Sequence, residues 1–145
     1  MIISVRSILY DDLKNKLSKE SDRVLVWSCN NCIKACGLGG AEKLKRLRDR
    51  LEEDGFDVVG TELISISCNR SLIEERKRNE EKRESIKAAT AIIVLACDDG
   101  LECVADAFPE KKAYAVQFHP EVLPSTHCAP VLRAFVFEIC VCAGN

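Results

Sequence analysis

The stretch "VLVWSCNNCIKACGLGG", residues 24–40, combines an apolar run with a cluster of thiols and a glycine-rich turn. The continuous apolar character over 23–27 is typical of a strand that is covered on both faces of a sheet. An amphipathic pattern follows over 41–54, with leucines on one face and Gly55 directly after it, which predicts a helix. The stretch therefore predicts a strand, a loop and a helix, which together are the repeating unit of an α/β fold.

The same alternation continues along the chain. Further strands are predicted over 56–67, 91–97 and 113–118, and Gly60 marks an expected bulge in the first of them. Strands that alternate with helices predict a three-layer, Rossmann- or flavodoxin-like α/β fold with about four parallel strands and helices on both faces. We expect residues 1–145 to form a single domain in which 113–145 complete the same sheet. The remaining helices are predicted over 8–19, 70–87, 101–108 and 129–142.

Composition excludes several classes of function. The chain has 145 residues, a formal charge of −2 and 47% residues of hydrophobic type, which suits one ordinary globular domain. A balanced charge does not favour nucleic acid or an anionic membrane as a partner. No apolar run approaches the ~20 residues of a membrane span, and the start lacks a secretory pattern. We therefore expect a cytoplasmic protein.

Nine cysteines are the most unusual feature of the composition. Right-handed crossovers place the carboxyl ends of parallel strands at one edge of the sheet, so thiols that follow different strands should converge there. Thiolates are soft ligands that suit zinc and iron–sulfur clusters. The spacing therefore predicts a metal site, either zinc or a four-iron four-sulfur cluster, held by four of five residues: Cys29, Cys32, Cys36, Cys68 and Cys97.

The remaining cysteines carry weaker signals. Cys103 falls inside a predicted helix and is interpreted as a small apolar residue of the core. Cys128, Cys140 and Cys142 fit either a core role or a role at the site.

Two resemblances extend this reading. The segments "VLVWSCNNCIKACGLGGAEKLKRL", "CNR" at 68–70 and "AIIVLACDDGLECVADAFPEKKAY" resemble the small partner subunit, or the C-terminal module, of methylenetetrahydrofolate reductase. This resemblance covers 1–115. It implies a metal-centre accessory subunit that acts beside a flavin-containing reductase subunit, in electron transfer or in assembly. Under this reading we expect no catalysis by the chain alone.

The end of the chain resembles a second family. The segment "AYAVQFHPEVLPSTHCAPVLRAFVFEICVCAGN", residues 113–145, looks like the last part of the glutamine amidotransferase domain of GMP synthetase. That resemblance implies that His119 and Glu121 belong to a Cys-His-Glu triad. Cys29 is then the preferred nucleophile, because it follows a strand at a suitable distance before His119, whereas Cys97 lies closer in sequence and its glycine is shifted by one position. The alternative function is therefore a glutamine amidotransferase-like hydrolase.

Two further possibilities remain open at this stage. The charged segment 70–87 suits a solvated helix or, less simply, a helix that docks a protein partner. The junction of two resemblances is explained by a fusion, natural or constructed, in which His119 is idle or donates a hydrogen bond near the metal edge.

Overall fold

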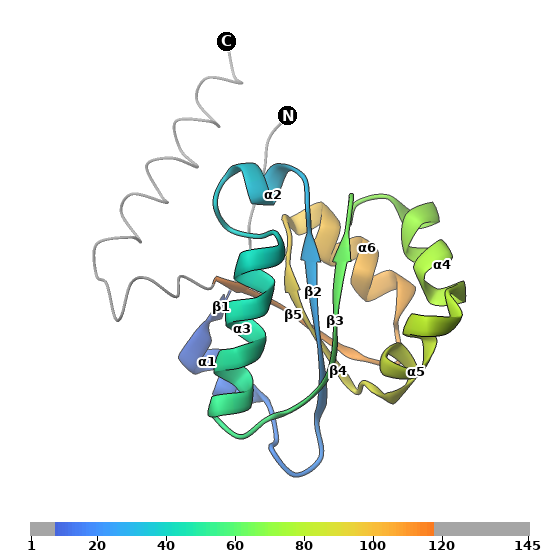
Figure 1. Cartoon of the computed structure of the whole chain (residues 1–145). Coiled ribbons are helices and arrows are strands. Elements are labelled where there is room, and N and C mark those ends of the chain that lie inside the picture. The colour runs from blue at the N-terminus through green and yellow to red at the C-terminus, as the bar shows by residue number, and fades with distance from the viewer. Residues whose placement is uncertain (1–7, 118–145) are drawn as a thin grey trace.

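The computed structural model describes residues 8–117, which form a parallel five-stranded sheet between two layers of helices (Figure 1). The strand order is β1-β5-β4-β2-β3, and every pair is parallel. The predicted three-layer α/β fold is confirmed, with five strands where about four were expected. The elements are β1 (Ile8–Leu9), α1 (Tyr10–Lys16), β2 (Arg23–Cys29), α2 (Cys32–Ala35), α3 (Ala41–Glu53), β3 (Asp57–Ile64), α4 (Arg70–Arg78), α5 (Glu80–Ala88), β4 (Ala91–Leu95), α6 (Asp98–Ala107) and β5 (Lys112–Gln117).

The extra strand comes from the start of the segment that was predicted as a helix over 8–19. Ile8 and Leu9 pair with β5, opposite Val116 and Gln117, and the helix begins only at Tyr10. The apolar spacing of the segment is the same for both assignments, so the sequence did not distinguish them. Pairing supplies β5 with backbone partners on its second side, which is the physical reason for the strand.

Alternate residues of the central strands enter two separate cores. On β2, Leu25 and Trp27 pack toward α4, α5 and α6, whereas Val24 and Val26 pack toward α1 and α3. All four side chains are fully buried. Burial on both faces explains why the sequence of this strand is continuously apolar.

The bulge predicted at Gly60 is confirmed. Val24 pairs with Val58 but Leu25 pairs with Gly60, so one residue of β3 is passed over. A Cβ atom on Gly60 would lie 2.8 Å from the Cβ atom of Ser85 on α5, so this position admits no larger residue without movement of the helix.

The charged segment 70–87 forms two helices instead of one. Asn79 has an extended backbone, with ψ at 119°, and its side chain accepts a hydrogen bond of 3.0 Å from the N–H of Glu81. Asn69 caps α4 in the same way, through the N–H of Ser71 at 3.0 Å. Asparagine competes well for such cap positions, and that preference divides the segment.

A hydrogen-bonded carboxylate links neighbouring segments at the amino end of the sheet. Asp22, which is 3% exposed, accepts hydrogen bonds from the backbone N–H of Ser18 at 2.8 Å and the hydroxyl of Thr90 at 3.2 Å. The ammonium of Lys112 lies 3.0 Å from the same carboxylate. These contacts join the residues that precede β2 and β4 to the first residue of β5.

A second buried carboxylate lies on β3, at the edge of the sheet. Glu62 is 1% exposed, and its oxygens lie 3.6 Å from Nε of Arg76 and 3.8 Å from Nζ of Lys82. Burial raises the pKa of Glu62 despite both cations. The guanidinium of Arg76 also donates to the backbone carbonyl of Leu63 at 3.3 Å, so it covers part of the strand edge.

Three predictions depend on residues beyond those that the structure describes. The helix expected over 129–142 lies outside the described residues, and completion of the sheet by 113–145 is seen only as far as β5. The single-domain organisation of the whole chain stays a prediction. Within 8–117, none of the helices has both the length and the apolar character that crossing a membrane requires.

Candidate functional site

The carboxyl ends of β2 and β4 form the point where the chain connections diverge. From β2 the chain runs through α3 on one face of the sheet to β3, and from β4 it runs through α6 on the other face to β5. Open parallel sheets bind ligands at this kind of position, because the diverging connections leave a crevice between neighbouring strands. The thiols that the sequence singles out follow these two strands.

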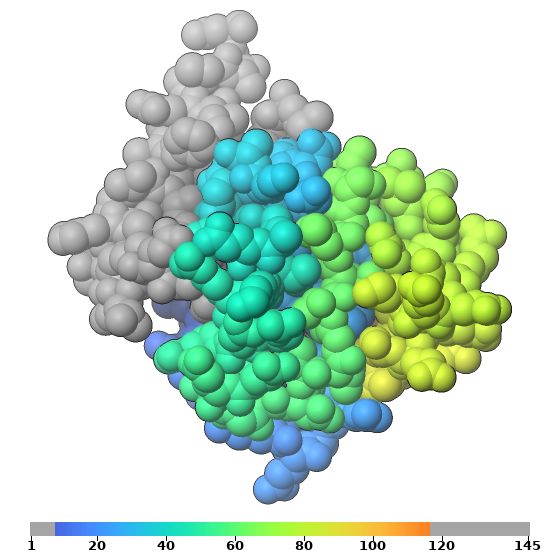
Figure 2. All heavy atoms as spheres, in the orientation of Figure 1, coloured from blue at the N-terminus to red at the C-terminus, as the bar shows by residue number. Residues whose placement is uncertain are grey.

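The loop after β2 folds back tightly onto the strand end. The hydroxyl of Ser28 accepts a hydrogen bond of 2.9 Å from the N–H of Gly40. A Cβ atom on Gly39 would collide with the side chain of Ile33 and lie 3.2 Å from the carbonyl oxygen of Cys29. Gly39 and Gly40 therefore allow the loop to pack closely against the strand end. Figure 2 shows α2 and the β3–α4 connection meeting at the surface of this end.

Cys29 lies below that surface. Its side chain is 3% exposed, and its sulfur accepts a hydrogen bond of 3.4 Å from the N–H of Ser67. The thiol in turn points to the carbonyl oxygen of Ser65 at 3.8 Å. Cys29 thus joins β2 to the segment after β3, in an environment that a substrate would not reach without local movement.

Cys97 lies in the short connection between β4 and α6. It follows β4 and is the N-cap residue of α6, and it is partly exposed. A Cβ atom on Gly100 would lie 2.9 Å from the Cβ atom of Ala96 and 3.1 Å from that of Ser67. The helix therefore packs closely against the strand end only because position 100 is glycine, and this packing fixes the turn that presents Cys97.

Cys32, the first residue of α2, lies near the other thiols of this edge. Burial raises the pKa of the Cys32 thiol to about 11, and the neighbouring Cys97 and Cys29 thiols add to the effect. Burial and then the Cys97 thiol likewise raise the pKa of Cys68, which follows β3. The predicted convergence of Cys29, Cys32, Cys68 and Cys97 at one edge is therefore present in the structure.

That convergence does not amount to a metal site in the described residues. Over residues 8–117, no three cysteine, histidine, aspartate or glutamate side chains are arranged so that they could hold a metal ion. Cys36, the fifth predicted ligand, ends α2. Cys103, on α6, is partly buried and packs against the core, as the sequence predicted.

Several predicted residues lie outside the described residues. These are His119 and Glu121 of the resemblance to amidotransferases, together with Cys128, Cys140 and Cys142. The end of β5 at Gln117 is the nearest described point to His119.

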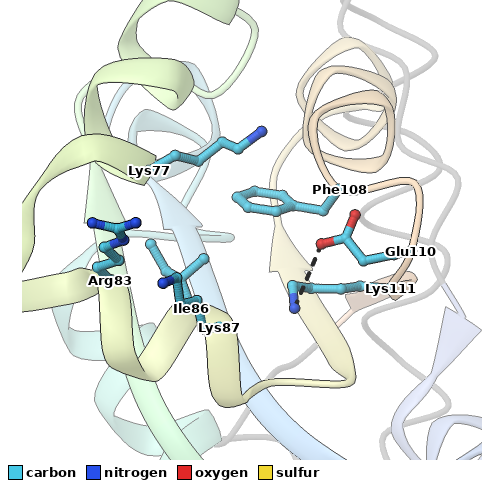
Figure 3. Close-up of a pocket in the computed structure, with 7 residues that line it drawn as sticks. All are labelled: Lys77, Arg83, Ile86, Lys87, Phe108, Glu110 and Lys111. Atoms are coloured by element: carbon cyan, nitrogen blue, oxygen red, sulfur yellow. Dashed lines mark ion pairs between the residues drawn. The ribbon is translucent and has the colours of Figure 1, made fainter.

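A separate hollow of about 260 Å³ lies between α4, α5 and the connection from α6 to β5 (Figure 3). Two of its three lysines are already engaged, since Lys77 donates to the carbonyl of Ala107 at 2.9 Å and Lys111 donates to that of Ala89 at 2.6 Å. None of the predicted site residues lines it, so the thiol edge remains the candidate site.

Comparison with known proteins supports one of the two resemblances. The chain matches the family described as class-I glutamine amidotransferase over residues 48–139, which run from within α3 past β5. A glutamine-hydrolysing GMP synthase of a Nostoc species is 51% identical over 49 residues, and that of Thermosynechococcus vestitus is 49% identical over 49 residues. Each match covers 34% of this chain but only 9% of the relative. No solved structure matches the chain significantly.

These matches correct the first interpretation of function. The interpretation of the chain as an iron–sulfur or zinc accessory subunit of a methylenetetrahydrofolate reductase is wrong, because the family match is to amidotransferases. The lack of a metal-holding group among residues 8–117 agrees with this correction. The thiol spacing led to the wrong function, because thiols that meet at one edge of a sheet do not for that reason bind a metal ion. Since the match covers more than half of its residues, the chain belongs to the class-I glutamine amidotransferase family.

Proposed function

We propose that the chain is a glutamine amidotransferase-like thiol hydrolase that cleaves the side-chain amide of glutamine. Cys97 is the proposed nucleophile, with His119 as the base and Glu121 as the residue that orients it. The observation that carries the proposal is the family match over 48–139, which includes these three residues and excludes Cys29.

The position of Cys97 in the fold supports this choice of nucleophile. β4 pairs directly with β5, from Ala91 opposite Lys112 to Val94 opposite Ala115, and the chain after β5 leads to His119. Cys29 follows β2, which is separated from β5 by β4. A nucleophile and its base must come within about 2.6–3.2 Å, so neighbouring strands are the simpler source of the pair.

The turn at Cys97 also suits the chemistry. The first N–H groups of a helix have no partner within that helix, so the start of α6 offers donors to an oxyanion that forms next to the thiol. The Cys97 thiolate would attack the amide carbon, and ammonia would leave with a proton from His119. Water, activated by the same imidazole, would then cleave the thioester and release glutamate.

The exposure of Cys97 and Cys29 also favours Cys97 as the nucleophile. Cys97 is partly exposed, whereas Cys29 is closed off by Ser65 and Ser67. The curated relatives are about ten times longer than the segment that they share with this chain. The proposal is accordingly restricted to amide hydrolysis, without an acceptor for the ammonia.

Ammonia release from glutamine tests the proposal. Cys97→Ser should lower the rate by about 10³-fold or more, because the thiol forms the covalent intermediate. Cys103→Ser, on the same helix, is the matched control and should retain the rate. A diazoketone analogue of glutamine should alkylate Cys97, as read by peptide mapping.

Two outcomes would contradict the proposal in different ways. Absence of ammonia release and of labelling in the folded chain would remove the hydrolase function. Labelling of Cys29, with activity lost in Cys29→Ser and retained in Cys97→Ser, would keep the function and return the nucleophile to the position first predicted from sequence.

A further inference from the structure

The hollow beside α4 and α5 lies at the end of the sheet opposite the thiols. Phe108, which lines it, caps the far end of α6 from Cys97, and its other lining residues include Lys87 before β4 and Lys111 before β5 (Figure 3). We propose that this hollow binds the phosphate group of a small molecule. The proposal is independent of amide hydrolysis, because the hollow shares no residue with the thiol edge.

The lining of the hollow is strongly positive. Four of its seven residues are cations and one is a carboxylate, although the whole chain has a formal charge of −2. The cations come from three segments: Lys77 from α4, Arg83 and Lys87 from α5, and Lys111 from the connection before β5. A hollow with charges of one sign on several sides concentrates ions of the opposite sign. The lining therefore favours an anionic ligand.

Helix ends account for only part of this positive charge. Lys77 donates to the carbonyl of Ala107 at the end of α6, and Lys111 donates to that of Ala89, which caps α5. The last turn of a helix carries roughly half a negative charge. The ends of α4, α5 and α6 together supply roughly −1.5, against the three net positive charges of the lining. A positive remainder therefore persists after the helix ends are neutralised.

Lys111 is the clearest indication of a ligand. Its side chain is only 7% exposed, and its ammonium donates to one acceptor, the carbonyl oxygen of Ala89 at 2.6 Å. The carboxylate of Glu110 is 3.6 Å away, beyond ordinary hydrogen-bond distance. An ammonium has three donors, and a buried charge is costly unless it is paired and hydrogen-bonded. Within residues 8–117 no further acceptor meets Lys111, so donors remain for an anion.

Arg83 and Lys87 add charge at the open side of the hollow. They lie four residues apart on α5, so they project from one face of the helix. Both are exposed, and neither forms an ion pair with another residue of the described part of the chain. A guanidinium binds phosphate oxygens through a planar fork, whereas an ammonium acts as a point charge. The combination of arginine and lysines therefore suits a phosphate group.

The size and the floor of the hollow limit the rest of the ligand. Its volume of about 260 Å³ lies just below the ~300–1,000 Å³ of pockets that hold drug-sized ligands. Ile86 and Phe108 form an apolar floor, and the ammonium of Lys77 lies 5.1 Å from the centre of the Phe108 ring. A phosphate monoester with a small apolar group would satisfy both the cations and this floor.

Isothermal titration calorimetry of the full chain at low salt tests the proposal, with inorganic phosphate and phenyl phosphate as probes. We expect both to bind, and phenyl phosphate to bind about fivefold more tightly because its ring adds apolar contact. Equal affinity for the two probes would assign the hollow to inorganic phosphate itself. Benzoate, which has the ring without the phosphate, should bind about tenfold more weakly than phenyl phosphate.

Matched variants separate the hollow from a general attraction to basic residues. The double variant Arg83→Gln with Lys87→Gln removes two exposed charges, and should weaken phosphate binding about tenfold without lowering the melting temperature. Lys45→Gln with Arg48→Gln removes the same charge from α3, on the other face of the sheet, and should bind as the unchanged protein does.

Three results would overturn the proposal. One is the absence of both heat and a rise in melting temperature with either phosphate probe at about 10 mM. Another is equal affinity of benzoate and phenyl phosphate, which would mean that the phosphate is not recognised. The third is an equal loss of affinity in the α5 and α3 double variants, which would reduce the effect to overall charge.

Lys111→Met gives a further check on the buried ammonium. We expect it to reduce phosphate binding more than the α5 double variant does, with far-UV circular dichroism to confirm that the chain is folded. Full phosphate affinity in a folded Lys111→Met variant would remove Lys111 from the site and overturn the argument from its unused donors.

Discussion

The two ends of the sheet use polar side chains in opposite ways. At the amino end, the carboxylate of Asp22 accepts hydrogen bonds from Ser18, Thr90 and Lys112, so its polar atoms are satisfied. At the carboxyl end, thiols crowd together, and Cys32 is raised in pKa by burial and by its neighbours. The difference indicates that the amino end stabilises the fold, whereas the carboxyl end holds groups available for chemistry.

The strongest test of this division is Asp22→Ala. The substitution leaves the N–H of Ser18 and the hydroxyl of Thr90 without their acceptor, so we expect a loss of about 3 kcal/mol in the free energy of unfolding. Urea denaturation at pH 7 measures it. Asp11→Ala, which removes a carboxylate that is 88% exposed, is the control and should change stability by less than about 0.5 kcal/mol.

The pH dependence of stability gives a second test of the Asp22 contacts. Burial opposes ionisation of Asp22, but the Ser18 and Lys112 hydrogen bonds outweigh it and lower the pKa below its ordinary value of 3.8. The stabilisation is therefore present above pH 3.8 and is lost as the pH falls through the folded-state pKa. If Asp22→Ala lost stability in acid as steeply as the unchanged protein, the role assigned to this carboxylate would be wrong.

Gly100→Ala should have the next largest effect, at the carboxyl end. Alanine normally stabilises a helix interior relative to glycine by about 0.5–1 kcal/mol. Here the added methyl group would lie 2.9 Å from the Cβ atom of Ala96, so we expect destabilisation by about 2 kcal/mol instead. Thermal denaturation shows whether the substitution lowers or raises the melting temperature. Combining it with Ala96→Gly should recover part of the loss, and an increase in melting temperature for Gly100→Ala would refute the packing argument.

Cys32→Ser should have the smallest effect, and only in alkali. Because the folded-state pKa is raised from 9.0 to about 11, the neutral thiol adds stability that is complete below pH 9 and is lost as the pH rises toward 11. Cys32 is partly exposed, so after solvent screening we expect on the order of 1 kcal/mol. Cys32→Ser should lose less stability than the unchanged protein between pH 9 and 11. Cys36→Ser is the control and should behave as the unchanged protein does. An identical alkaline slope in Cys32→Ser would count against the interpretation.

Sequence patterns predicted the architecture well because the strong signals are local. The apolar run of β2, the leucine face of α3 and the glycine at position 60 each report a structural constraint at their own position. Periodicity failed where the decisive contact lies far away in the chain. Ile8 and Leu9 form a strand because β5 offers a partner more than a hundred residues later, and no local signal encodes that pairing.

The site was predicted in position but not in chemistry. The order of the strands correctly brought Cys29, Cys32, Cys68 and Cys97 to one edge. Metal coordination also needs donors at fixed distances and angles, which spacing in sequence does not determine. The short motif at the end of the chain indicated the family more reliably than the thiols did, since the amidotransferase match extends over it.

The buried carboxylate on β3 has a consequence for solubility. β3 is the outermost strand of the sheet, and an open strand edge is a template on which another chain can add and begin aggregation. A neighbouring strand that docked there would have to displace Arg76 from the carbonyl of Leu63 and from Glu62, which would remove one of the two cations beside that buried carboxylate. We therefore expect Arg76 to oppose the addition of another strand at this edge.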